Sequence, residues 1–96
     1  MFLKHSKTIR QCEAAINSAK YVLSDEEYSE SMDYILKHNE WLVGLEFAMD
    51  LIDEYERKIT FDTYSEFEKA FSLMDLVPNK RLFRLKEQIE ETEQSR

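Results

Sequence analysis

The chain has 96 residues, a formal net charge of −7, and a single glycine and a single proline. So few turn residues exclude β-barrels and hairpin-rich folds, which need them every few positions. The acidic charge argues against nucleic acid as a partner, because binding phosphates requires a basic surface. The composition instead predicts a helical protein with a basic partner.

Compartment and membrane context follow from what the sequence lacks. Its one cysteine, Cys12, cannot form an internal disulfide, so nothing points to an oxidising compartment. No apolar run approaches the ~18–20 residues of a membrane span. The first residues have no apolar segment like that of a signal peptide. We therefore expect a soluble, cytoplasmic protein without a membrane partner.

Apolar residues at helical spacing predict the first two helices. The first covers about 6–21 and carries one narrow apolar stripe that includes Cys12. Ser24, with Glu27 three residues later, forms a capping-box pattern that begins the second helix, which runs to about residue 37. Asn39 marks the corner that follows, since asparagine tolerates the left-handed conformation at a helix end. The inner face of the second helix is formed by Tyr28, Met32, Ile35 and Leu36.

The third helix, about 40–56, is the most apolar and is expected to lie centrally. Gly44 within it lowers helix propensity by about 1 kcal/mol relative to alanine, which indicates a point of close packing and not a break. Its wide apolar arc consists of Trp41, Leu42, Leu45, Ala48, Met49, Ile52 and Tyr55.

Two further helices complete the chain. Thr60 is the expected N-cap of the fourth, and Ile59 and Tyr64 occupy the positions of a hydrophobic staple. Pro78 is expected to stop that helix and to open the fifth. The apolar residues of these helices are Phe61, Tyr64, Phe67, Phe71 and Met74, then Leu82, Leu85 and Ile89. Residues 90–96 are polar and are expected to form a frayed tail.

The predicted fold is all-α, a single compact bundle of about five helices without a sheet. Residues 1–96 form one domain, and with 43% apolar residues the chain can fill its core. The residues expected in the shared core are Trp41, Leu45, Ile52, Phe67, Phe71 and Leu85.

Catalytic and metal-binding patterns are absent from the sequence. Neither His5 nor His38 has a glutamate three residues before it, as a di-iron bundle requires. Cys12 lies on an apolar stripe, where a small buried side chain is the ordinary interpretation, whereas a nucleophile needs exposure and a basic neighbour. There is no phosphate-binding glycine loop and no nucleophile elbow. We expect no enzymatic activity, no metal and no cofactor.

The charges are distributed unevenly along the chain. Residues 1–23 carry a net charge of +3 and residues 57–96 a net charge of zero. Residues 24–56 carry a net charge of −10, with Lys37 as the only base. Acidic helices usually carry lysine or arginine four residues away, and like charges at this spacing are slightly destabilising. The central segment is therefore a candidate surface for a basic partner.

The carboxylates of this segment recur at i, i+4 and i+7 on both helices. We predict a binding surface formed by Glu26, Glu30 and Asp33 on the second helix and Glu46, Asp50, Asp53 and Glu54 on the third. Tyr34 is the candidate for an exposed aromatic contact, whereas Trp41 and Tyr55 are expected in the core. The alternative is that a C-terminal basic cluster neutralises the carboxylates, namely Lys80, Arg81, Arg84 and Lys86.

Several short segments between Leu23 and about Leu85, two-thirds of the chain, match a known family. They are Leu23-Ser24-Asp25-Glu26-Glu27, His38-Asn39-Glu40-Trp41, Leu45-Glu46-Phe47-Ala48, Asp50-Leu51-Ile52, Ile59-Thr60, Tyr64 and Leu73-Met74-Asp75-Leu76. Through these segments the sequence resembles the MafI-type immunity proteins of contact-dependent growth inhibition systems. The family consists of small helical bundles that accompany polymorphic toxins.

This resemblance implies a toxin inhibitor of the bacterial cytoplasm, which binds and blocks the toxic C-terminal domain of a cognate effector. Many such toxins are nucleases with a basic substrate groove, which suits an acidic partner. The family has no catalytic residues to carry over. The alternatives are an acidic helical adaptor or self-associating bundle, and a small enzyme or a nucleic-acid mimic acting on a DNA-binding protein.

Overall fold

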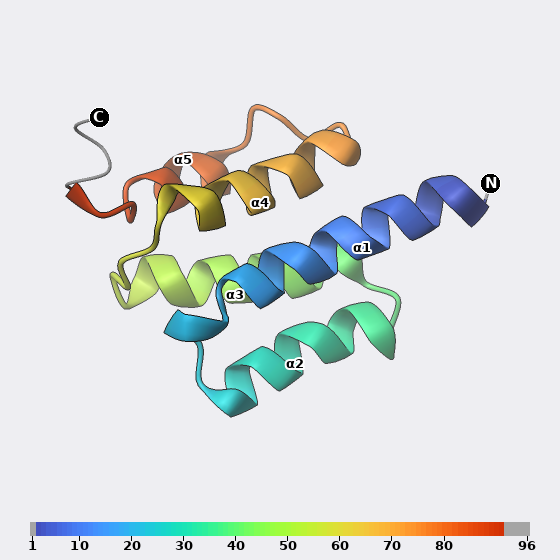
Figure 1. Cartoon of the computed structure of the whole chain (residues 1–96), viewed down its shortest axis with the longest axis horizontal. Coiled ribbons are helices and arrows are strands. Elements are labelled where there is room, and N and C mark those ends of the chain that lie inside the picture. Colours follow the sequence, from blue (N-terminus) through green and yellow to red (C-terminus); the bar gives the residue numbers. More distant parts are fainter. Residues whose placement is uncertain (1, 92–96) are drawn as a thin grey trace.

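The computed structural model describes residues 2–91, with side chains from residue 6 onward. Its five α-helices are α1 (Phe2–Ser18), α2 (Asp25–Leu36), α3 (Trp41–Glu54), α4 (Phe61–Leu73) and α5 (Lys80–Lys86), and a 3₁₀ turn at Lys20–Val22 follows α1 (Figure 1). The described residues contain no strand, only an isolated bridge between Ile59 and Ile89. The predicted all-α bundle is confirmed.

The helices pack as a closed ring around one core. Helix α1 contacts α4 and α2, α2 contacts α3, and α5 closes the ring between α3 and α4. In Figure 1, α1 runs between α4 and α2 and also crosses α3, which lies behind it. This order leaves the outer faces of α2 and α3 side by side at the surface.

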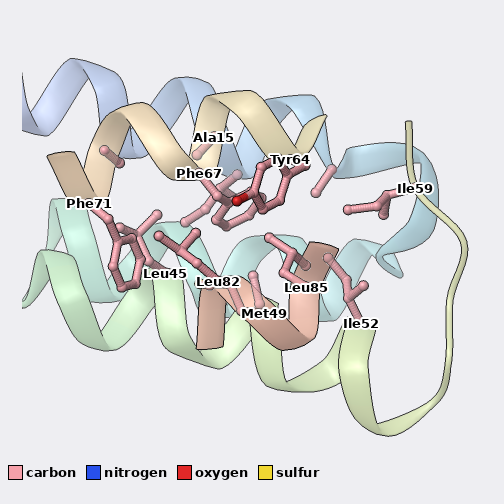
Figure 2. Close-up of a cluster of buried hydrophobic side chains, with 14 of the residues drawn as sticks. Ala15, Leu45, Met49, Ile52, Ile59, Tyr64, Phe67, Phe71, Leu82 and Leu85 are labelled. Atoms are coloured by element: carbon pink, nitrogen blue, oxygen red, sulfur yellow. The ribbon is translucent and has the colours of Figure 1, made fainter. Parts of the chain in front are cut away.

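The core is built from side chains of all five helices, and Figure 2 labels many of these residues. Leu45, Ile52, Phe67, Phe71 and Leu85 are fully buried, as predicted. Trp41 is only half-buried and packs against the edge of the core, so its core placement was wrong. It is the first residue of α3, and its indole N–H donates to the Oδ1 atom of Asn39.

Three other aromatic or aliphatic residues expected to face inward are exposed. Leu36, Tyr55 and Phe61 are between 51% and 62% exposed. Each stands at a helix end: Leu36 closes α2, Tyr55 caps α3 and Phe61 opens α4. The helical period places them on the apolar side, but at the helix ends their side chains stay exposed.

The predicted starts of α2 and α4 are confirmed by their caps, whereas α1 begins at Phe2, earlier than the predicted residue 6. The Ser24 side chain accepts the Glu27 N–H, and the Glu27 carboxylate accepts the Ser24 N–H, so both bonds of the capping box form. The Thr60 hydroxyl accepts the Thr63 N–H at the start of α4. Asn39 has a φ of 54°, as expected for the corner before α3.

Gly44 is a point of close packing between α2 and α3, as predicted. A Cβ atom there would lie 2.8 Å from the backbone oxygen of Ser31 and 3.1 Å from Cγ1 of Ile35. Only glycine lets the two backbones approach this closely.

The connection from α4 to α5 differs from the expectation for Pro78. Helix α4 ends at Leu73, where Asp75 adopts a left-handed conformation with a φ of 59°. Pro78 follows in the loop after a cis peptide bond, and the Asn79 side chain caps α5 by accepting the Arg81 N–H. Pro78 therefore neither stops α4 nor opens α5.

Helix α5 ends at Lys86, earlier than predicted, and Ile89 belongs to the bridge instead. The Ile59 N–H donates to the Gln88 carbonyl at 3.0 Å, and the Glu90 N–H donates to the Ile59 carbonyl at 2.9 Å. Both isoleucines are buried. Glu90 is therefore held by the fold and is not part of the expected tail, and residues 92–96 lie outside the described part of the chain.

Candidate protein-binding surface

Helices α2 and α3 run antiparallel and present one continuous outer surface. The Tyr34 and Phe47 rings lie 5.8 Å apart at one end of the seam between the helices. At the other end, Arg57 just after α3 contacts Glu27 near the start of α2. The acidic first half of α2 therefore lies beside the acidic second half of α3.

The three predicted carboxylates of α2 occupy its outer face. Glu26 and Glu30 are exposed and form no ion pair with a described residue. Asp33 is half-buried and lies 3.6 Å from the Nζ atom of Lys37, which is itself 70% exposed. Such an exposed pair contributes little stability and leaves most of the negative charge uncompensated.

On α3 the exposed edge beside α2 contains two residues that the sequence reasoning missed. Val43 is exposed and Phe47 half-buried, and both share a stripe with Asp50 and Glu54 at i, i+4, i+7 and i+11. This spacing, outside the main apolar arc, was the available signal. Val43, Phe47 and Tyr34 form an apolar strip, and the acidic side chains flank it.

Tyr34 is less exposed than predicted. Its ring packs against Phe47 and lies 6.1 Å from the ring of His38, so the side chain is half-buried. Aromatic side chains held in this way lose little conformational freedom on binding. Tyr34 and Phe47 thus form a fixed aromatic contact at one end of the seam between α2 and α3.

The other predicted stripe of α3 faces α5, where Arg81 binds two of its carboxylates. Arg81 donates from Nε to Oδ1 of Asp50 at 2.9 Å, and from Nη1 to Oε2 of Glu46 at 3.0 Å. A third bond, from Nη2 to Oδ2 of Asp50, makes that pair bidentate and raises the pKa of Arg81. Asp53 continues the stripe and, like Glu54, has no ion pair with a described residue.

Within the C-terminal basic cluster, one residue neutralises carboxylates of α3, so the alternative is only partly fulfilled. Arg81 compensates Glu46 and Asp50, whereas Lys80, Arg84 and Lys86 are exposed and pair with no described acid. We name the outer face of α2 and α3 the acidic surface, formed by Glu26, Glu30, Asp33, Tyr34, Val43, Phe47, Asp50 and Glu54.

Glu27 belongs to the same acidic segment but has a structural role. Arg57 donates to both of its carboxylate oxygens and to the Val22 carbonyl. The bonds from Arg57 to the carboxylate, together with the bond from the Ser24 N–H, lower the pKa of Glu27 to about 2. The pair ties α2 to the end of α3 and fixes one end of the acidic surface.

Cys12, the candidate nucleophile of the sequence, lies in the core and not on the acidic surface. Cys12 is fully buried, and burial, assisted by the nearby Glu13 charge, raises the pKa of its thiol to about 12. In the described part of the chain, no three His, Cys, Asp or Glu side chains cluster closely enough to hold a metal ion. A thiol with this pKa is not a nucleophile at neutral pH.

A groove of about 690 Å³ lies between α1 and α4. Its polar groups are engaged within the fold: the Tyr21 hydroxyl accepts the Thr60 N–H, and Glu66 accepts from the Gln11 amide. Neither histidine nor cysteine lines it. Its lining residues are Ala14, Asn17, Ser18, Tyr21, Thr60, Asp62, Thr63 and Glu66.

Comparisons with known proteins do not assign a function to the acidic surface. Among the described residues, no helix is both long and apolar enough to cross a membrane. No protein-family model, no curated protein and no solved structure matches the chain.

Proposed function

We propose that the protein is an immunity protein that binds the toxic C-terminal domain of a cognate effector in the bacterial cytoplasm. The partner is a nuclease with a basic substrate groove, and the acidic surface occupies that groove. One observation carries the proposal: uncompensated carboxylates, among them Glu26, Glu30 and Glu54, lie on the same outer face of α2 and α3 as the half-buried Tyr34–Phe47 pair. The resemblance to MafI-type immunity proteins supports it independently.

The energetics of the surface favour a cationic partner. Like charges one helical turn apart repel, and lysine or arginine side chains of a partner would relieve this repulsion. Tyr34 and Phe47 supply the apolar contact that dominates binding energy at the centre of an interface. The surrounding charges accelerate association with a basic groove, which suits rapid capture of a toxin. Neutralisation by such a mechanism requires no catalytic group.

Reversing the charge of Glu30 and Glu54 tests the proposal. Both are exposed and unpaired, whereas Asp50 is unsuitable because its replacement would release Arg81. We expect Glu30→Lys/Glu54→Lys to weaken binding of the toxin domain by more than about 2 kcal/mol, or about 30-fold. Its melting temperature should be unchanged or higher, because the repulsion within the surface is relieved. Association kinetics and thermal melts at two salt concentrations provide the measurement.

A control with the same change in net charge separates a local contact from a general electrostatic effect. Glu68 and Glu87 are exposed on α4 and at the end of α5, away from the acidic surface. Glu68→Lys/Glu87→Lys should change the affinity no more than about threefold. Equal weakening by both double variants, or no weakening by either, would contradict the proposed interface.

A further inference from the structure

The outer face of α5 carries an exposed aromatic residue among cations. Phe83 is 61% exposed, and Lys80 and Arg84, three residues before it and one after it, are exposed on the same side of the helix. The helix contains four bases and no acid. Leu82 and Leu85 point into the core, so this face has no partner within the described residues. We name Lys80, Phe83 and Arg84 the basic face.

The basic face and the acidic surface both combine aromatic side chains with charged side chains, and the charges have opposite signs. On α5, one aromatic side chain is flanked by cations; on α2 and α3, the Tyr34–Phe47 pair is flanked by carboxylates. An aromatic side chain with charges around it is typical of a small interface with an apolar centre and a polar rim. The two faces are complementary in charge, and each contains an aromatic side chain.

Within one molecule, a cation of α5 already binds carboxylates of α3. Arg81 bridges Glu46 and Asp50, which lie one helical turn apart on α3. Phe83 lies two residues after Arg81 and therefore points to nearly the opposite side of α5. Phe83 thus faces away from the acidic surface of its own chain, although Arg81 of the same helix binds the edge of that surface.

We propose that the basic face of one copy docks on the acidic surface of a second copy. This contact is head-to-tail, because different surfaces of the two copies meet, and each added copy leaves one of each face free. Its small area and its charged rim make it weak and sensitive to salt. A further consequence, which rests on the proposed function, is that a toxin domain competes with self-association for the acidic surface.

Two variants that each lose one face test the head-to-tail contact. Lys80→Glu/Phe83→Ser removes the basic face, and Glu30→Lys/Glu54→Lys removes the acidic surface; all four residues are exposed. Thermal melts first establish that both variants fold. Sedimentation velocity then measures the mass of each protein up to about 1 mM, at about 50 mM and about 300 mM salt.

The wild-type mass should increase with concentration at low salt and return to that of a monomer at high salt. Each variant alone should stay monomeric, because one half of every contact is missing. An equimolar mixture should form dimers and nothing larger, since one intact face of each kind remains. A wild-type protein that stays monomeric throughout, or a mixture that stays monomeric while the wild type associates, would overturn the proposal.

The same variants distinguish failure here from failure of the proposed function. Lys80→Glu/Phe83→Ser should bind the toxin domain as tightly as the wild type at low protein concentration, because its acidic surface is intact. If the wild type associates but binds no toxin domain, the head-to-tail contact stands and the immunity function is wrong. If the toxin domain binds and the wild type never associates, the immunity function stands and the head-to-tail contact is wrong.

Discussion

Glu56 and Asp75 end α3 and α4 in a conformation that most residues avoid. Their φ angles are 50° and 59°, in the left-handed region. After each, the next N–H bonds back into the last turn: Arg57 to the Ile52 carbonyl and Leu76 to the Phe71 carbonyl, both at 2.9 Å. This is the Schellman arrangement, in which glycine is the usual left-handed residue. The only glycine of the chain lies elsewhere, so both termini carry backbone strain.

Replacing Glu56 by glycine should therefore stabilise the protein. We expect Glu56→Gly to raise the free energy of unfolding by about 0.5–1 kcal/mol, because glycine adopts positive φ without strain. Removing a negative charge from the C-terminal end of a helix acts in the same direction. Glu54→Gly removes the same charge from a helical position and should lower the free energy of unfolding by a similar amount. Urea denaturation measures both, and a loss of stability in both variants would contradict the assignment of strain.

At the scale of elements, the α2–α3 pair depends on the absence of a side chain at Gly44. Gly44→Ala should lower the free energy of unfolding by about 1–3 kcal/mol, although alanine has the higher helix propensity. The added Cβ would meet the Ser31 backbone oxygen at 2.8 Å, and a backbone atom cannot move without shifting α2. Val43→Ala, at the exposed neighbouring position, should change stability by less than about 1 kcal/mol. A more stable Gly44→Ala protein in chemical denaturation would show that the helices have room to separate.

The Glu27–Arg57 pair gives the α2–α3 unit a dependence on acid. Binding to Arg57 lowers the pKa of Glu27 from 4.5 to about 2 in the folded protein. Its stabilisation is complete above about pH 4.5 and is lost as the pH falls towards 2. Both side chains are about a quarter exposed, which reduces the energy of the pair.

Glu27→Gln should lower the free energy of unfolding by about 1–2 kcal/mol at neutral pH, since the charge-assisted bonds to Arg57 are lost. It should also flatten the decline in stability between pH 4.5 and 2. Glu26→Gln, at the exposed neighbouring position, serves as the control. Urea denaturation at several pH values measures the effect, and parallel profiles for wild type and Glu27→Gln would rule out the pair as the cause.

Helix starts were predictable because their signals are local. Ser24 and Thr60 each form the capping bond that the sequence indicates, within three residues of the cap. The end of α4 was not predictable from a local signal, because Asp75 occupies the left-handed position that glycine or asparagine usually marks. The end of α5 was also missed: the pairing of Ile89 with Ile59 depends on the whole fold, and the apolar spacing alone suggested a longer helix.

For the whole molecule, the same difference between local and distant signals decides how much of the candidate surface the sequence predicts. The spacing of Glu26, Glu30 and Asp33 is local, and the structure retains it on one helix face. The binding of Arg81 to Glu46 and Asp50 joins residues more than 30 positions apart and has no local pattern. Choosing among four C-terminal bases required the packing of α5 against α3.

The bridge between Ile59 and Ile89 joins the two ends of a segment that contains both α4 and α5. Because Ile59 and Glu90 hold each other's backbone, these two helices should open together, as one cooperative unit, rather than fray from the C-terminal end. The amide hydrogens of Ile59 and Glu90 should then exchange with solvent as slowly as those of the buried turns of α4. The amide of Asp62, in the unbonded first turn of α4, should exchange quickly. Hydrogen exchange followed by NMR measures this, and rapid exchange at Glu90 would show that the last residues open alone.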